Sequence, residues 1–311
     1  MTLPGHLRYL HRGTLFVLLV LVTAGPAWAE YCKSQGSPRL PKSQIGPYDA
    51  AALLSPTQII DSEAKHLPWG RPGCSRILFH VEYVLCYDVN RKVALWASYR
   101  LEAVDVVDAN RVNAFRTDPR LPIDQNASCD DYAGSGFDRG HMVPRSDMNR
   151  SLVAMVNTFF LTNMTPQRPN VNQGAWARLE DWVRAWAKVS GWVHVISGSV
   201  FDDDDDQQPD DPANARLSQG SSGAGVPSHY YKLVIRATSP GQVEAITILI
   251  PNATNVPGRN TQDTTKDNYL RNRIRNITEI RKRTGLDLIP APPFNKTTLE
   301  QAVASDLWPR N

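Results

Sequence analysis

The chain has 311 residues, of which 41% are hydrophobic and 21% charged, and its 34 Lys and Arg against 31 Asp and Glu give a formal charge of +3. This composition is that of a globular protein and excludes a collagen, a coiled coil, a multispan membrane protein and a polybasic arm. Any surface that binds nucleic acid must therefore be a local concentration of positive charge.

The N-terminus has the pattern of a secretory signal peptide. Arg8 and Arg12 precede an apolar run over residues 15–22 that is too short to span a bilayer, and Ala27-Trp28-Ala29 offers small residues at a cleavage site. We expect residues 1–29 to be removed and the mature protein to be secreted or periplasmic, without membrane attachment. The alternative is an uncleaved anchor or a buried helix.

All four cysteines lie after this segment, in a part of the chain expected to meet an oxidising compartment. They are Cys32, Cys74, Cys86 and Cys129, and no two of them form a Cys-x-x-Cys pair, which argues against a zinc ribbon. Two structural disulfides are expected. Three pairings are possible, and the sequence does not choose among them.

The elements follow in chain order after the signal peptide. Residues 30–70 are rich in turn formers and are expected to be irregular, which leaves residues 71–311 as the main domain. Alternating apolar residues and β-branched runs predict a hairpin and later strands, and helical periodicity predicts two long helices. The expected strands are 81–88, 93–101, a short apolar strand at 159–161, 192–197, 230–236 and 243–250; the expected helices are 172–190 and 268–284, the latter ended by Gly285 as its left-handed cap. Strands without regular β-α alternation favour an α+β architecture.

An acidic run over residues 202–206, followed by Asp210 and Asp211, allows two interpretations. A calcium site is one of them, but the run lacks the spacing of an EF-hand loop. Dense like charges usually mark a solvated loop. We favour the loop.

Three ionisable side chains are concentrated in Asp138-Arg139-Gly140-His141. In an extended strand, Arg139 and His141 point to one face and Asp138 to the other. One face then carries a phosphate ligand and a base that titrates near pH 7, while Asp138 can orient groups from behind. On its own, the cluster is equally compatible with a buried structural histidine beside an Arg–Asp pair.

A second cluster opens the helix expected over residues 172–190. Asn172 falls on the apolar stripe of this helix, at its first turn, so its side chain is expected to face the protein, and its ordinary role there would be a helix N-cap. At about 100° per residue, Glu180 and Arg184 lie roughly 80° and 120° around the helix from Asn172, so they flank the same side. The stripe itself consists of Trp176, Leu179, Val183 and Trp186.

Together the two clusters resemble the DNA/RNA non-specific endonuclease family, the ββα-metal nucleases. The segment Asp138-Arg139-Gly140-His141 matches the DRGH signature of that family, and residues 172–180 match its metal-ligand helix, with Arg184 four residues further on. The similarity extends from residues 83–88 to about residue 290. It implies an α+β fold in which a central antiparallel sheet is flanked by helices around a ββα-metal nuclease core.

The resemblance also implies a reaction and a role for each residue. His141 would be the general base that deprotonates water, and Asn172 would be the direct ligand of Mg²⁺, for which Mn²⁺ or another divalent cation can substitute. Glu180 would hold a metal-bound water, while Arg139 and Arg184 would contact phosphate. The expected activity is hydrolysis of phosphodiester bonds in DNA and RNA without strong sequence preference, leaving 5′-phosphates.

One departure from the family pattern concerns an arginine that contacts phosphate shortly before a Thr-Asp-Pro segment. Thr117-Asp118-Pro119 is present, but the family position aligns with Asn113, and Arg111 lies two residues out of register. Arg111 is therefore a candidate substrate contact only.

Three other classes compete with a nuclease. A nucleic-acid-binding or DNA-uptake protein on a nuclease fold would need to lack the base or the metal ligand, and both are present. A secreted zinc hydrolase is disfavoured because no His-Glu-x-x-His occurs. A structural extracellular domain leaves the clustered polar residues unexplained. The preference between DNA and RNA stays open, as does the oligomeric state, with a homodimer as one possibility.

Overall fold

The structure is a computed structural model that describes residues 29–32, 41–110, 112–210, 216–217 and 223–310. The predicted signal peptide falls almost entirely on residues outside these ranges. Within them, no helix combines the length and apolar character needed to cross a bilayer.

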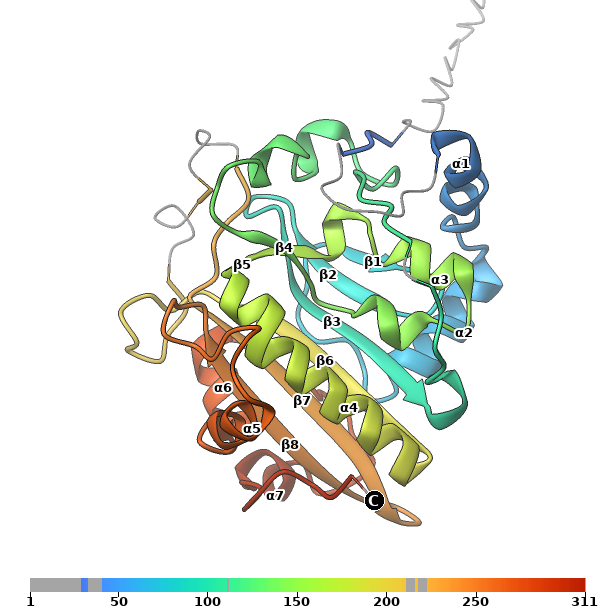
Figure 1. The fold of residues 1–311 in the computed structure, drawn as a ribbon. Helices are drawn as coiled ribbons and strands as arrows, with labels where there is room; N and C mark the ends of the chain where they lie inside the picture. The colour runs from blue at the N-terminus through green and yellow to red at the C-terminus, as the bar shows by residue number, and fades with distance from the viewer. Residues whose placement is uncertain (1–28, 33–40, 111, 211–215, 218–222, 311) are drawn as a thin grey trace, which may run out of the picture.

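A seven-stranded antiparallel sheet forms the centre of the molecule, with the strand order β1-β2-β3-β6-β7-β8-β9 (Figure 1). The predicted hairpin and the three later strands all belong to this sheet, so the expectation of a central antiparallel sheet is confirmed. The strands are β1 (Ile77–Phe79), β2 (Val84–Asp88), β3 (Val93–Glu102), β6 (Trp192–Val200), β7 (His229–Ser239), β8 (Gln242–Pro251) and β9 (Ile274–Arg275).

Both faces of the sheet are buried, because alternate residues of its strands enter two different cores. In β2, Leu85 and Tyr87 pack in one core, whereas Val84 and Cys86 pack in the other. The first core includes the apolar stripe of α4 (Trp176–Ser190), which lies across the front of the sheet in Figure 1. The four predicted stripe residues of α4 are all fully buried, which confirms the predicted orientation of this helix.

Seven α-helices are present in the described residues. Two of them, α1 and α2, fall in the segment expected to be irregular, so that expectation is wrong. The single helix predicted over 268–284 is also wrong, because the short strand β9 separates α5 from α6; its predicted cap is right, since Gly285 has φ 67°. The helices are α1 (Lys42–Ala51), α2 (Pro56–His66), α3 (Leu152–Asn157), α4, α5 (Asp263–Arg271), α6 (Ile277–Thr284) and α7 (Lys296–Gln301).

Two disulfides join Cys32 to Cys129 and Cys74 to Cys86. The expected number of two disulfides is confirmed, and the structure shows which of the three possible pairings forms. The first bond joins two segments that lie 97 residues apart in the sequence, and the second bond joins Cys86 of β2 to the segment before β1.

A smaller two-stranded sheet lies beside the large one and leads into α4. It consists of β4 (Asp138–His141) and β5 (Met164–Gln167), which pair antiparallel. The short strand expected at 159–161 is wrong, since a 3-10 turn over Leu161–Asn163 precedes β5. The succession of β4, β5 and α4 provides the ββα core, so the predicted α+β fold class is confirmed.

Candidate active site

Strand β4 presents its side chains as the alternation of a strand requires. The guanidinium of Arg139 lies 5.2 Å from the centre of the Phe115 ring, and the imidazole of His141 lies 5.9 Å from the same ring centre. Both side chains therefore lie on one side of the strand, as predicted. Asp138 lies on the other side and turns toward the start of α4.

Asn172 is held in place by Asp138. The Asn172 amide nitrogen donates to Asp138 Oδ2 at 2.8 Å, and the amide nitrogen of Gln173 donates to the same oxygen at 2.7 Å. Because an ionised carboxylate only accepts hydrogen bonds, Asp138 fixes which end of the Asn172 amide faces it. Asn172 makes no N-cap hydrogen bond, so the capping role considered for it is wrong. Among the described residues, no donor reaches its amide oxygen.

The turn that carries Asn172 is a π-helical turn over Val171–Ala175, and it contains the non-helical residue Gly174 (φ −119°, ψ −105°). The uniform rotation of about 100° per residue, used to place Glu180 and Arg184 relative to Asn172, therefore does not hold across this turn. A Cβ on Gly174 would lie 2.1 Å from the carbonyl oxygen of Pro257. Only glycine allows the loop before α5 to approach so closely.

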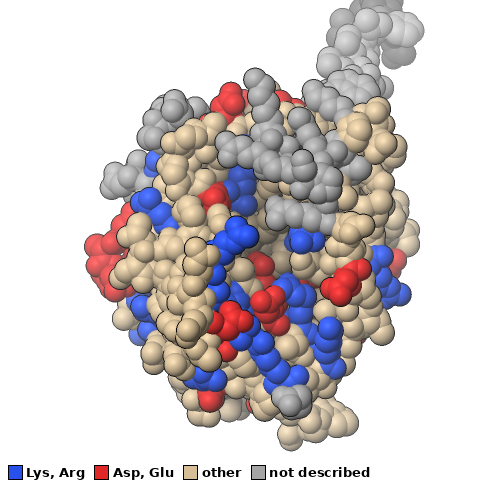
Figure 2. Space-filling view, viewed as in Figure 1, with Lys and Arg blue, Asp and Glu red and all other residues tan. Residues whose placement is uncertain are grey.

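A cleft of about 910 Å³ opens between β4 and this turn. On the face of the molecule drawn in Figure 2, the surface is hollowed near the middle, and Lys and Arg side chains lie beside the hollow. Of the predicted site residues, Asp138, Arg139 and Asn172 line the cleft, whereas His141, Glu180 and Arg184 are not among its lining residues. Its other lining residues include Phe115, Tyr132, Phe137, Gln173 and Arg259.

His141 sits between this cleft and the core. Its ring meets the Phe159 ring edge to face, with 5.0 Å between the ring centres, and its carbonyl accepts a hydrogen bond from the Trp176 indole at 3.3 Å. Val143 lies two residues after His141. Its N–H donates a hydrogen bond to the side-chain oxygen of Asn163, and its carbonyl oxygen accepts one from the side-chain nitrogen of Asn163. These contacts join the strand of the imidazole to α4 and to the turn before β5.

Arg139 is positioned by a backbone carbonyl. It donates to the Cys129 carbonyl oxygen at 3.0 Å, beside the disulfide to Cys32, and its guanidinium faces the rings of Phe115 and Tyr132. Burial lowers the pKa of Arg139 from its ordinary value, and the residue stays a cation at any physiological pH. Among the described residues, Arg139 has no carboxylate partner within ion-pair distance.

Glu180 and Arg184, both partly buried residues of α4, belong to a group of charges that includes the buried Asp147 and Lys232. Arg184 donates to the buried Asp147 at 2.9 Å and also pairs with Asp181. Burial lowers the pKa of Arg184, but the carboxylates of Asp147 and Glu180 outweigh that effect and raise it overall. Burial raises the pKa of Glu180, and the nearby charges of Lys232 and Arg184 limit that rise.

Lys232 is a functional candidate that the sequence reasoning missed. It is fully buried, donates to Ser197 Oγ at 2.6 Å, and lies with its ammonium 4.4 Å from the centre of the Trp176 ring. Burial lowers its pKa, while the Glu180 carboxylate opposes that shift. A single lysine inside the apolar strand Tyr230–Ile235 was the available signal.

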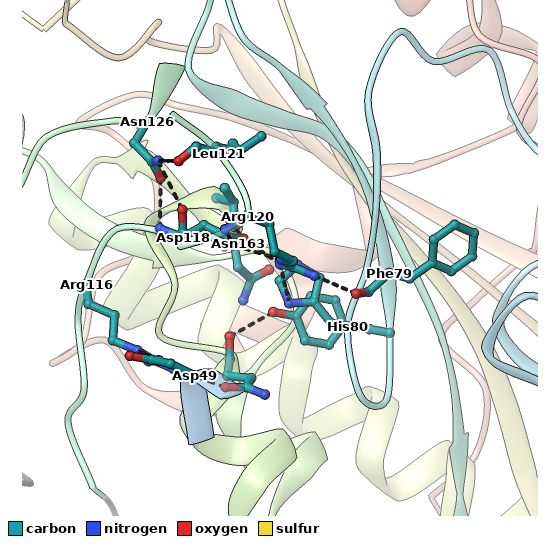
Figure 3. A network of polar contacts seen from close by, with 12 residues as sticks. Asp49, Phe79, His80, Arg116, Asp118, Arg120, Leu121, Asn126 and Asn163 are labelled. Atoms are coloured by element: carbon teal, nitrogen blue, oxygen red, sulfur yellow. Dashed lines mark hydrogen bonds and ion pairs between the residues drawn. The ribbon is translucent and has the colours of Figure 1, made fainter. Parts of the chain in front are cut away.

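A second missed feature is the polar network behind the site, drawn in Figure 3. The fully buried Arg116 donates to Asp49 at 2.6 Å and to the carbonyl oxygens of Ala114 and Val156 at 2.9 Å. Burial would raise the pKa of Asp118, but its ion pair with Arg120 lowers it well below the ordinary range. The Thr-Asp-Pro segment thus lies in the core.

Arg111 lies outside the described residues, so its role as a substrate contact stays a prediction. Asn113, at the aligned family position, is buried.

In the acidic run, the carboxylates of Asp202, Asp204 and Asp210 converge within 4.8 Å, and Asp202 also pairs with Arg283. Asp203–Asp206 are exposed, as a solvated acidic loop requires.

A family model described as DNA/RNA non-specific endonuclease matches residues 63–294. The chain belongs to this family. The family assignment made from the DRGH segment and the Asn172 helix is thus confirmed by a match over most of the chain.

Similar proteins carry nuclease names. The mitochondrial endonuclease G of Homo sapiens is 34% identical over 192 residues, which are 60% of this chain and 63% of that protein. The mitochondrial endonuclease G of Bos taurus is 33% identical over 60% of this chain and 62% of its own length. The chain therefore spans less than two thirds of these relatives. A nuclease of Nostoc is 27% identical over 79% of this chain and 89% of its own length.

A solved structure has the same fold. The crystal structure of the EndoG/EndoGI complex, which concerns the mechanism of EndoG inhibition, matches with a TM-score of 0.65 over 79% of this chain and 96% of the matched chain. Its sequence identity is 24%, so this likeness bears on the fold alone.

Proposed function

We propose that the mature protein is a secreted or periplasmic, divalent-metal-dependent endonuclease that hydrolyses phosphodiester bonds of DNA and RNA without strong sequence preference. The observation that carries this proposal is the hydrogen bond from Asn172 to Asp138. It joins the DRGH strand to the first turn of α4, so that an amide oxygen and a cationic guanidinium reach one cleft. Family membership and the two disulfides support it.

The residues present fit a hard cation. Mg²⁺ and Mn²⁺ prefer oxygen ligands, and Mg²⁺ keeps several waters when one or two protein groups bind it. Asn172 offers an oxygen that accepts no hydrogen bond from the described residues, because Asp138 holds the amide nitrogen. When bound there, the cation would stabilise negative charge that develops on the phosphate and on the leaving oxygen.

The side chains of this chain would do the remaining work. His141 would take the proton of the attacking water, Arg139 would contact the phosphate, and Glu180 would hold a water near the cation. Arg184 pairs with Asp147 and Asp181, so it would contact the phosphate only by leaving one of these carboxylates. Water adds to phosphorus while the bond from phosphorus to the 3′-oxygen breaks. The products would therefore carry 5′-phosphates.

Cleavage by the purified mature protein tests this proposal. Plasmid DNA and a structured RNA are incubated with the protein in Mg²⁺ or Mn²⁺, with and without EDTA, and product ends are checked by ligation. We expect cleavage of both substrates, loss in EDTA and ligatable 5′-phosphate ends.

His141→Ala supplies the matched variant. It should lower turnover by about 10²–10⁴-fold, because it removes a general base, and should leave binding nearly intact. If the wild-type protein binds DNA but cuts neither substrate in either metal, the protein is a nucleic-acid-binding protein on a nuclease fold. If a folded His141→Ala variant stays within a few-fold of wild type, His141 is not the base.

A further inference from the structure

We infer that Arg259, which lies outside the two segments that match the family signature, is an additional phosphate-binding residue of this cleft; this inference rests on the proposed function. Arg259 lines the cleft together with Asn172 and Arg139, yet it lies far from both in the sequence. Its position comes from the loop between β8 and α5, residues 252–262.

This loop is docked tightly on the turn that carries Asn172. The Pro257 carbonyl oxygen accepts a hydrogen bond from the N–H of Ala175 at 3.1 Å. On the other side, the amide nitrogen of Asn170 donates to the carbonyl oxygens of Thr254 and Val256. The loop that carries Arg259 therefore has a fixed position relative to Asn172.

The base of the loop is fastened as well. Asn252 donates to the carbonyl oxygens of Pro166 and Pro227, and it accepts a hydrogen bond from the N–H of Arg168 at 2.8 Å. At the other end of the loop, the Lys266 ammonium donates to the Arg259 carbonyl oxygen at 3.2 Å. The backbone of Arg259 is therefore held, while its side chain is exposed.

The charge of Arg259 is not neutralised by a neighbour. Among the described residues, no carboxylate lies within ion-pair distance of its guanidinium. Other arginines near α4 are paired: Arg178 binds Asp263 and Asp267, and Arg184 binds Asp147 and Asp181. An exposed, unpaired guanidinium at the rim of a cleft that Arg139 also lines is suited to a phosphate of the substrate.

The chemistry of this contact predicts how it acts on the reaction. A contact to phosphate does not depend on the identity of the base, so Arg259 would raise the affinity for all nucleotide sequences to a similar extent. A contact to a phosphate other than the reacting one is made equally in the ground state and the transition state, so its loss should raise KM and leave kcat nearly unchanged.

Binding measurements in a His141→Ala background test this assignment. The dissociation constants of Arg259→Ala, Arg259→Lys and Arg76→Ala are compared for a 20-base-pair duplex and a single strand between 50 and 200 mM salt. Arg76 is the matched control because it is exposed and does not line the cleft, and among the described residues no carboxylate pairs with it.

We expect Arg259→Ala to weaken binding about tenfold and to flatten the slope of log affinity against log salt by about 0.9 for the duplex and about 0.7 for the single strand. Arg259→Lys should keep the slope, and Arg76→Ala should change neither value. With His141 present, Arg259→Ala should raise KM about tenfold and change kcat less than twofold.

The outcomes separate this inference from the proposed function. An unchanged slope in Arg259→Ala, or an equal loss in Arg76→Ala, overturns the role of Arg259 while cleavage by wild type stands. A fall in kcat without a rise in KM also overturns it. Absence of cleavage by wild type in Mg²⁺ and Mn²⁺ refutes the proposed function instead.

Discussion

The amide of Asn172 shows how one neighbour decides the chemistry of a side chain. Asp138 accepts from the amide nitrogen, so the amide oxygen points away from this carboxylate and is the proposed ligand of the cation. The same residue type has a different task at Asn276, whose oxygen accepts from the N–H of Glu279 at 2.8 Å and caps α6. The two asparagines therefore differ in what their oxygens do: that of Asn276 caps a helix, and that of Asn172 is the proposed metal ligand.

Asn172→Ala should abolish metal-dependent cleavage, with partial recovery at high Mg²⁺ concentration, because it removes the proposed ligand oxygen. Its free energy of unfolding should change little through capping, since no cap is lost. Asn276→Ala should lose about 0.5–2 kcal/mol of stability and keep its activity per folded molecule. Thermal unfolding and a metal titration on the same samples distinguish the loss of a metal ligand from the loss of a helix cap. An Asn172→Ala variant with unchanged metal dependence would contradict the proposed ligand.

At the scale of elements, the active site depends on one close approach between two backbones. The π-helical turn before α4 and the loop before α5 meet at Gly174, where no Cβ fits against Pro257 and Gly258. This contact sets the position of Asn172 on one side and of Arg259 on the other. Gly174 thus links the two walls of the cleft.

Gly174→Ala should destabilise the protein by about 1–3 kcal/mol, because backbone atoms must move to admit the methyl group. Cleavage should fall as well, since the turn and the loop separate. Gly73→Ala is the control: its Cβ would meet its nearest neighbour, Leu286, at 3.9 Å, so stability should change by less than about 0.5 kcal/mol. Urea unfolding and cleavage rates check both variants. Normal stability and activity in Gly174→Ala would show that the loop is not rigidly docked.

Elements with a strong local signal could be predicted from the sequence. The apolar stripe of α4, the alternation in β2 and β3, and the Gly285 cap are local patterns, and all are present. The π-helical turn at Val171–Ala175 and the break between α5 and α6 could not be predicted, because contacts with distant segments produce them. The cleft likewise joins Asp138, Asn172 and Arg259 across more than a hundred residues. Motif matching found the first two, and only packing shows the third.

At the scale of the whole molecule, three histidines are buried around the sheet. His66, His80 and His194 are each at most 2% exposed, and His194 contacts Ser98 Oγ through its Nε2 at 2.9 Å. Burial lowers the pKa of each imidazole, in the case of His194 to about 3. None of the three lies in the cleft, so their protonation concerns stability rather than the reaction chemistry.

Acid should therefore destabilise the protein well above the range where carboxylates titrate. The unfolded chain binds protons at these histidines below their ordinary pKa of about 6.5, while the folded chain does not, so the free energy of unfolding falls as pH falls. Each buried histidine contributes about 1.4 kcal/mol per pH unit between that value and its folded pKa. His194→Gln removes one such group and should make the slope shallower by about that amount between pH 6 and 4. Urea unfolding at constant ionic strength measures both slopes, and equal slopes would show that His194 is protonated in the folded protein.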